Sequence, residues 1–398
     1  MVTRRLFCKR MSLVPLFIGA DILMGKDENK FDFERAEFIL KPEIFIKHTS
    51  EREFIGPGSI LLKNGDILMA APWGRPPANF EQLAAKFPVP ALYRSKDGGR
   101  NWNKEQKINM SWNLPGMISD GGISFLHLQD GRLALVAHRH VQELHGGGLP
   151  IIAFSSDEGK TWSAAKTVGG PEGVWYVMND RLIQMGCGRM IIPVSHMPED
   201  IGAYEGDRTL GLCFYSDDGG TTWQKSRKPA DLKDERGMAE PTVAEIDKNR
   251  LIMLARTGSG FLYRSYSNDS GDTWSPPEAT SLPAACSPIT LKTLPDGRLI
   301  IFYNHAKPIE KGAFFPRTPL VYAVSPDKGK SWMSPVIVDD DGMKKNNRQN
   351  IYPTVCFTKE GMLVIWSTHI ADPNGSFDEI SGGWKIGGGK RAILAYPT

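Results

Sequence analysis

Histidines lie at the predicted ends of apolar strands in four segments of the chain. A histidine at such an end can act as a general acid or base, or bind an acidic ligand, because its pKa lies near neutral pH. No two of these residues share a compact ligand motif, so we expect no metal site and no cofactor. The residues are His138, His140, His196, His305 and His369.

A carboxylate and a guanidinium stand at the two ends of one predicted hairpin. Glu240 opens the first strand, within Ala239–Val243, and Arg256 closes the second, Leu251–Arg256. The tight turn between these strands returns Arg256 to the edge at which Glu240 begins. A planar guanidinium at that edge is suited to holding a carboxylate.

A repeated element must position these side chains. Five eight-residue segments follow the pattern Ser-x-Asp-x-Gly-x-Thr-Trp, with Asn101 and Ser331 replacing Thr in the first and last. They start about 50 to 60 residues apart, which indicates a structural repeat. The Asp can accept backbone N–H groups, the Gly permits positive φ, and the Trp fills the gap beneath the turn. These Asp boxes are Ser95–Trp102, Ser155–Trp162, Ser216–Trp223, Ser267–Trp274 and Ser325–Trp332.

Six tight turns lie between apolar strands, and an Asp box follows each of the first five hairpins. The sixth hairpin is followed by Arg391–Tyr396, a strand without a box, and 38–48 is a lone strand that could complete the last unit. We therefore predict an all-β fold, a six-bladed β-propeller with five Asp-box repeats, over residues 31–398. The turns are Asn64–Asp66, Asp130–Arg132, Cys187–Arg189, Lys248–Arg250, Asp296–Arg298 and Glu360–Met362.

The composition argues against two classes of function, nucleic-acid binding and zinc binding. The 398 residues carry a net charge of +3 without clustered basic side chains, so we expect no nucleic-acid partner. The 41 glycines and 28 prolines fit a fold with many turns. The five cysteines have no Cys-x-x-Cys spacing, which argues against a zinc site.

The first 30 residues are predicted to be an export signal or a disordered tail. Arg4 and Arg5 precede a short apolar run, as in a twin-arginine signal, and Asp21 interrupts that run. The run is too short for a membrane span. We expect a periplasmic or secreted protein with no membrane contact beyond this signal.

Asp-box repeats at this period resemble the sialidase (neuraminidase) superfamily, and the likeness covers roughly residues 38–398. Asp boxes also occur in other propellers, including binding modules. The function must therefore be argued from the residues at the mouth of the propeller.

The resemblance implies roles for four residues. Tyr352 would be the nucleophile, and Glu240 would be the base that takes its phenolic proton. Arg256 and Arg317 would be two of the three arginines that hold the substrate carboxylate. A neutral Tyr avoids the repulsion that a carboxylate nucleophile would meet from an acidic sugar, which is the exception to the usual two-carboxylate scheme.

Two positions depart from the family pattern. Sialidases have Phe-Arg-Ile-Pro where this chain has Phe54-Ile55-Gly56-Pro57, so the first clamp arginine is missing and Arg52 is the nearest candidate. The long loop 73–90, which carries the acidic Asp in sialidases, contains none. Asp120 is the candidate general acid, and a capping or turn role for it is an equal alternative.

The sequence therefore predicts an exo-acting glycoside hydrolase, similar to sialidases, that releases a terminal acidic sugar from a glycan or glycoconjugate. Two alternatives stay open. One is a hydrolase or lyase on another acidic polysaccharide, which would use the histidines, with His138 and His140 binding the substrate. The other is a non-catalytic glycan-binding propeller.

Overall fold

The computed structural model describes residues 34–47, 56–71, 91–107, 117–118, 122–140, 148–170, 172–197, 208–234, 236–306, 317–341, 348–371 and 384–398. The elements in these ranges are β-strands, as predicted for an all-β fold. Within the same ranges, no helix has the length and hydrophobicity needed to cross a lipid bilayer. The predicted signal in residues 1–30 lies outside the described residues, as do Arg52 and Asp120.

Three four-stranded antiparallel sheets follow the predicted hairpin pattern. Their strands are short apolar runs separated by Gly- or Asn-containing turns, which is the local signal for hairpins. The first is β3 (Gly58–Leu61), β4 (Ile67–Ala71), β5 (Ala91–Ser95) and β6 (Asn103–Lys107). The second is β17 (Ala239–Asp247), β18 (Arg250–Arg256), β19 (Phe261–Ser267) and β20 (Glu278–Pro283). The third is β25 (Arg348–Phe357), β26 (Met362–Ala371), β27 (Trp384–Leu394) and β2 (Phe38–Lys47).

A fourth sheet has five strands, because a short N-terminal strand pairs in parallel with its outer edge. One strand of this sheet, Leu299–Asn304, is buried along its whole length, as expected for a strand covered on both faces. Its strands, in spatial order, are β1 (Glu34–Arg35), β24 (Val336–Asp339), β23 (Leu320–Ser325), β22 (Leu299–Asn304) and β21 (Thr290–Thr293).

The fifth sheet has ten strands and contains two successive hairpin series. A single residue pair, Gly148 with Trp175, joins the two series. The first series is β7 (Met117–Ile118), β8 (Ser124–His127), β9 (Leu133–His140), β10 (Gly148–Ser155) and β11 (Lys166–Thr167). The second is β12 (Val174–Tyr176), β13 (Ile183–Gln184), β14 (Met190–Met197), β15 (Leu210–Ser216) and β16 (Gln224–Lys225). The described residues thus form five sheets, and the predicted count of six blades stays a prediction.

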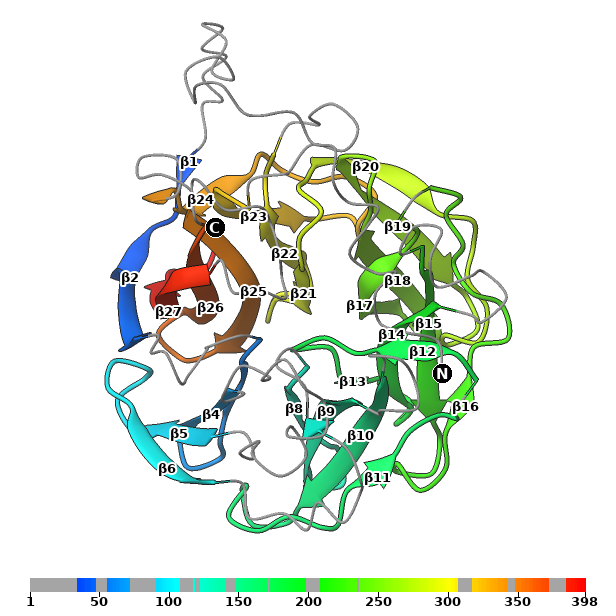
Figure 1. Ribbon diagram of the computed structural model, residues 1–398, viewed down its shortest axis with the longest axis horizontal. Coiled ribbons are helices and arrows are strands. Elements are labelled where there is room, and N and C mark those ends of the chain that lie inside the picture. The colour runs from blue at the N-terminus through cyan, green and yellow to red at the C-terminus, as the bar shows by residue number, and fades with distance from the viewer. Residues whose placement is uncertain are drawn as a thin grey trace, which may run out of the picture. The chain divides into compact units, whose positions relative to one another are not determined.

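The first strands of the sheets meet at a common centre (Figure 1). Strand β3 contacts β8, β17 contacts both β14 and β21, and β25 contacts both β21 and β3. The hydrophobic core lies between neighbouring sheets. One cluster, for example, joins Ile300 and Phe302 of β22 to Val364 and Trp366 of β26.

The Asp boxes form hydrogen-bonded turns of one kind. In the second box, Ser155 Oγ donates to Asp157 Oδ1 at 2.8 Å and accepts the Gly159 amide at 2.9 Å, while the Thr161 amide donates to Asp157. Corresponding bonds occur in the other four segments. In the third box, hydrogen bonds from Thr222 and Ser216 lower the pKa of Asp218 to about 2. The box Asp is therefore ionised at neutral pH and serves the turn.

The box glycines pack against the preceding sheet. Gly159 has a φ of 82°, and a Cβ there would meet Leu68 of β4 at 2.9 Å. Gly99 has a φ of 94°, and a Cβ there would meet Leu363 of β26 at 2.7 Å. The first box therefore packs on the last sheet, which requires glycine at this position for both space and backbone conformation.

The lone N-terminal strand predicted at 38–48 pairs with the C-terminal strand. Strand β2 runs antiparallel to β27 and completes the last sheet, which confirms the prediction. Because these strands come from opposite ends of the described chain, their pairing ties the last sheet to the start of the first.

Lys390 provides a test of how neighbouring sheets are held together. Its Nζ donates to Asp339 Oδ2 at 2.7 Å and to Asp341 Oδ2 at 2.8 Å, and the Lys390 and Asp339 side chains are 3% and 2% exposed. Lys390→Met should lower the free energy of unfolding by about 3–5 kcal/mol, because it leaves a buried carboxylate without its counterion. Urea denaturation followed by tryptophan fluorescence measures the loss.

Lys328→Met is the matched control. Lys328 pairs with Asp247 at 2.7 Å, but both side chains are about half exposed. This exposed pair should contribute about 0–1 kcal/mol. Equal losses for the two variants would contradict a special role for the buried Lys390.

Candidate active site

Glu240 and Arg256 lie at one end of the β17–β18 hairpin. Ala239 pairs with Arg256 in the ladder, and Arg256 Nη2 donates to Glu240 Oε1 at 2.7 Å. Both side chains are nearly buried, at 12% and 10% exposed. The expectation that the turn returns Arg256 to Glu240 is confirmed. The other carboxylate oxygen, Glu240 Oε2, is buried and accepts no hydrogen bond from the described residues.

Arg317 is fixed through its backbone between two sheets. Its amide donates to Gln349 Oε1 at 2.7 Å, and its carbonyl accepts from Asn304 Nδ2 and the Asn350 amide, each at 2.9 Å. Gln349 and Asn350 lie on β25, the strand that carries Tyr352. This network of short bonds holds Arg317 close to the start of the last sheet.

The charges of the other three predicted residues act on Arg317. Burial lowers the pKa of Arg317, and the neighbouring charge of Arg256 lowers it further. The charges of Tyr352 and Glu240 act to raise the same pKa. These four residues come from β17, β18, β25 and the segment before β23. They therefore share one electrostatic environment, as expected for a site that handles an anion.

Glu240 and Tyr352 have the same unusual backbone. Their φ angles are 47° and 53°, in the left-handed region that a residue with a side chain seldom adopts. Each precedes a proline, and each lies where the register of its strand pair shifts. Such strained positions cost about 1–3 kcal/mol and concentrate at functional sites.

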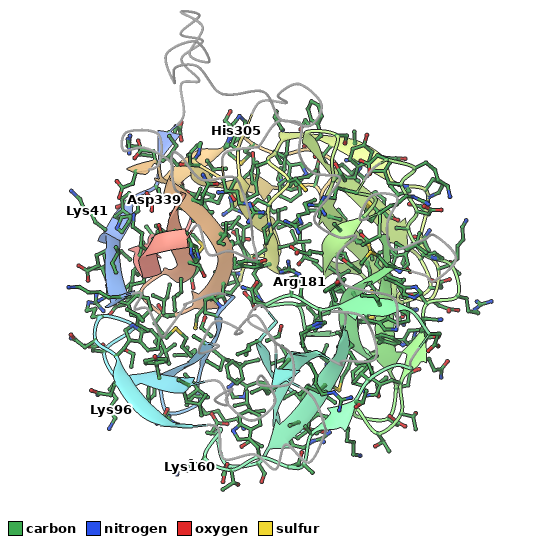
Figure 2. The ribbon with its side chains drawn as sticks, in the orientation of Figure 1. Lys41, Lys96, Lys160, Arg181, His305 and Asp339 are labelled. Carbon is green, nitrogen blue, oxygen red and sulfur yellow. The ribbon has the colours of Figure 1, made fainter. Side chains whose placement is uncertain are left out.

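Arg181 belongs to the same environment and was missed in the sequence. Burial lowers its pKa to about 10, against the raising effects of Glu240 and Asp180, and Tyr352 acts in the same direction as these carboxylates. Its guanidinium is 1% exposed, and Nη2 donates to the backbone carbonyl of Glu240 at 3.4 Å. Figure 2 shows Arg181 near the centre where the sheets meet. The available signal was the polar run Asn179–Arg181, which stands just before the first strand of the third hairpin.

Four of the five strand-end histidines have described side chains, and these four are buried. His138 is 1% exposed and stacks on Tyr176, with ring centroids 5.6 Å apart, and His196 stacks on Trp175 at 3.7 Å. Burial lowers the pKa of His305 to about 4, so its ring is neutral at physiological pH. His369 is 2% exposed. In this arrangement these imidazoles pack within the protein and leave almost no surface for a ligand.

The remaining predicted site residues have no described side chain. His140 ends β9, where it pairs with Gly148, but its side chain lies outside the described residues. Arg52 and Asp120 lie outside them altogether. Among the residues that the structure describes, no group of three or more His, Cys, Asp or Glu side chains could hold a metal ion.

Solved structures with this fold are mostly sialidases. A protein of unknown function from Dyadobacter fermentans has 18% identity and a TM-score of 0.64, covering 90% of this chain and 99% of its own. The intramolecular trans-sialidase from Ruminococcus gnavus has 16% identity and a TM-score of 0.60, covering 89% and 97%. The Trypanosoma rangeli sialidase has 14% identity and a TM-score of 0.58, covering 90% of this chain and 58% of that one.

At these identities the likeness shows the fold. No curated protein matches the sequence. The model of the BNR repeat-like domain family, in contrast, matches residues 140–365, more than half of the chain. This match agrees with the Asp boxes and with the sialidase-like fold, and it confirms the predicted superfamily. The chain belongs to the BNR repeat-like domain family.

Proposed function

We propose that this protein is an exo-acting glycoside hydrolase that releases a terminal acidic sugar, sialic acid or a close analogue, from a glycan. The observation that carries the proposal is the ion pair between Arg256 and Glu240. The backbone of Arg317 is bonded to Gln349 and Asn350 of β25, the strand that carries Tyr352. Planar guanidinium groups match a carboxylate in geometry and charge. A tyrosine nucleophile fits a substrate whose reacting carbon already carries a negative group.

In the proposed reaction, Glu240 takes the phenolic proton and the Tyr352 oxygen attacks the anomeric carbon. The C–O bond to the leaving glycan breaks, and a general acid supplies the proton that this oxygen needs. Water then cleaves the bond between the sugar and Tyr352, and the phenol recovers its proton. Glu240 is suited to the base role because Arg256 holds Oε1, while Oε2 accepts no hydrogen bond from the described residues. Asp120 stays the candidate acid.

We also propose that the five sheets form a six-bladed β-propeller. The ten-stranded sheet divides into two blades at the single pair between Gly148 and Trp175. Contacts between successive first strands, and the pairing of β2 with β27, support closure of the ring. Export through the signal around Arg4 and Arg5 would place the enzyme in the periplasm or outside the cell.

The histidine-based alternative has less support. The His138, His305 and His369 side chains are buried, and His305 Nδ1 lies 3.3 Å from the Tyr303 hydroxyl. The His305 ring, which is neutral at physiological pH, is poorly suited to bind an acidic sugar directly.

The first test is turnover of a fluorogenic α-sialoside by the full chain and by Tyr352→Phe. The substitution removes the nucleophilic oxygen and retains the ring, so kcat should fall by about 10³-fold or more. Tyr396→Phe, which removes a hydroxyl that donates to the Thr358 carbonyl at 2.7 Å, should keep wild-type turnover. Wild-type protein that releases no sialic acid, or equal activity in the two variants, would overturn the proposal.

The second test concerns the carboxylate clamp. Arg317→Met should raise KM for the α-sialoside by about 10- to 100-fold, because a charge-assisted hydrogen bond contributes about 1.5–3 kcal/mol. Steady-state kinetics gives this change, and circular dichroism checks the fold. Arg250→Met removes a 44%-exposed arginine that pairs with Asp247, and it should leave KM unchanged. An unchanged KM in Arg317→Met would remove Arg317 from the clamp.

A further inference from the structure

Three consecutive residues between β12 and β13 contact the starts of the surrounding first strands. This central segment, Asn179–Arg181, bonds with residues at or near β3, β8, β17, β21 and β25. No residue of the segment is more than 5% exposed. A short segment that bonds to so many sheets can set the positions of their strand starts relative to one another.

Asn179 bonds to the strand that carries Tyr352 at the point where its register shifts. Its Nδ2 lies 3.3 Å from the Tyr352 carbonyl, 3.0 Å from the Pro353 carbonyl and 3.1 Å from the Pro57 carbonyl. Tyr352 has a positive φ and precedes a proline, so its carbonyl is displaced from the strand ladder. The side-chain amide of Asn179 supplies the missing donor from another sheet.

Arg181 holds the start of the strand that carries Glu240. Its Nη1 donates to the Asn179 carbonyl at 2.7 Å and its Nη2 to the Glu240 carbonyl at 3.4 Å. The Glu240 amide is fixed from a different side, because it donates to Ser195 Oγ at 2.6 Å. One guanidinium therefore connects the Asn179 backbone to that of Glu240.

Asp180 anchors the segment between these two contacts. Its amide donates to the Ile123 carbonyl at 3.0 Å, its Oδ2 accepts the Val355 amide at 3.0 Å, and its Oδ1 accepts from Lys292. Asp180 itself has a φ of 57°. The same left-handed conformation thus occurs at Asp180, Glu240 and Tyr352, and the contacts of the segment link all three.

We propose that Asn179 and Arg181 are positioning residues that hold Glu240 and Tyr352 in register for proton transfer. This inference rests on the proposed function, because it assigns the two held residues the roles of base and nucleophile.

The charge of Arg181 has a second effect, on the ionisation of Tyr352. The charges of Glu240, Asp180, Arg256 and Tyr352 act on Arg181, and Asp180 is also paired with Lys292. Arg317 is subject to the charges of Arg256, Tyr352 and Glu240. Arg181 therefore adds a buried positive charge that favours tyrosinate.

The kinetic test compares Arg181→Met, Arg181→Lys and the wild type on the α-sialoside. Arg181→Met should lower kcat by about 100-fold with little change in KM, because a small misplacement of reacting groups costs about that much. It should also move the pH dependence of kcat/KM to higher pH, because tyrosinate loses a neighbouring cation. Arg181→Lys, which retains the charge, should restore the pH dependence while kcat recovers only in part.

Arg189→Met is the matched control. Arg189 pairs with Asp217 at 2.7 Å and packs over Tyr215, so its loss changes stability without touching the central segment. It should leave kcat and the pH dependence unchanged. If Arg181→Met lost activity only in proportion to its unfolded fraction, with the pH dependence unchanged, Arg181 would be a structural residue and the inference would be wrong.

A measurement that needs no turnover separates this inference from the proposed function. The near-ultraviolet absorbance of tyrosinate is titrated in the full chain and in Tyr352→Phe, and the difference gives the ionisation of Tyr352. Repeating the pair on the Arg181→Met background should raise the Tyr352 midpoint by about one pH unit or more. If Arg181→Met does not fold, Asn179→Ala replaces it, and a lowered kcat in the folded variant is expected. A shifted midpoint without sialoside turnover would keep the coupling and reject the sialidase activity, whereas an unshifted midpoint would reject the coupling.

Discussion

Buried backbone groups at the starts of the first strands have to find hydrogen-bond partners, and much of the structure depends on how they do so. At Glu240-Pro241 and Tyr352-Pro353 the ladder shifts register, and proline has no N–H to donate. The displaced carbonyls face the centre and accept from Arg181 and Asn179 instead. An unpaired buried carbonyl costs about as much as a lost hydrogen bond, so the central segment is a condition for this arrangement of strands.

Around this centre, the sheets are joined mainly by side-chain packing. Core clusters combine strands of neighbouring sheets, as in the two that join β22 with β26 and β4 with β9. Box glycines such as Gly99 and Gly159 allow the turns to approach the preceding sheet. The pairing of β2 with β27 adds a main-chain connection between the two ends of the described chain. The positions of the strand starts are therefore fixed from outside by packing and from inside by the hydrogen bonds of Asn179–Arg181.

The charges at the centre are unusual for a structure that only has to be stable. Arg181, Arg256 and Arg317 lie in one environment, and burial lowers the pKa of both Arg181 and Arg317. Burying like charges is unfavourable unless a partner offsets them. Glu240 and Asp180 supply part of the negative charge, and Asp180 is already paired with Lys292. An anionic ligand would offset the remaining positive charge of the arginines. This need for negative charge is the reason to expect an acidic sugar at this centre.

Local sequence determined most of the elements and part of the site. The Asp boxes, the turns and the strand that became β2 follow from patterns that act within a few residues, and the contact between Arg256 and Glu240 follows from one hairpin. The roles proposed for Tyr352 and Arg317 came from resemblance to a family. Only the tertiary structure placed Arg181 against the Glu240 carbonyl and Asn179 against the Tyr352 carbonyl, because these contacts join three different sheets. It also decided that His138 and His305 are buried, since a strand end in the sequence does not show whether a neighbouring sheet covers it. Contacts between sheets depend on how the strands converge, and no local pattern in the chain encodes that convergence.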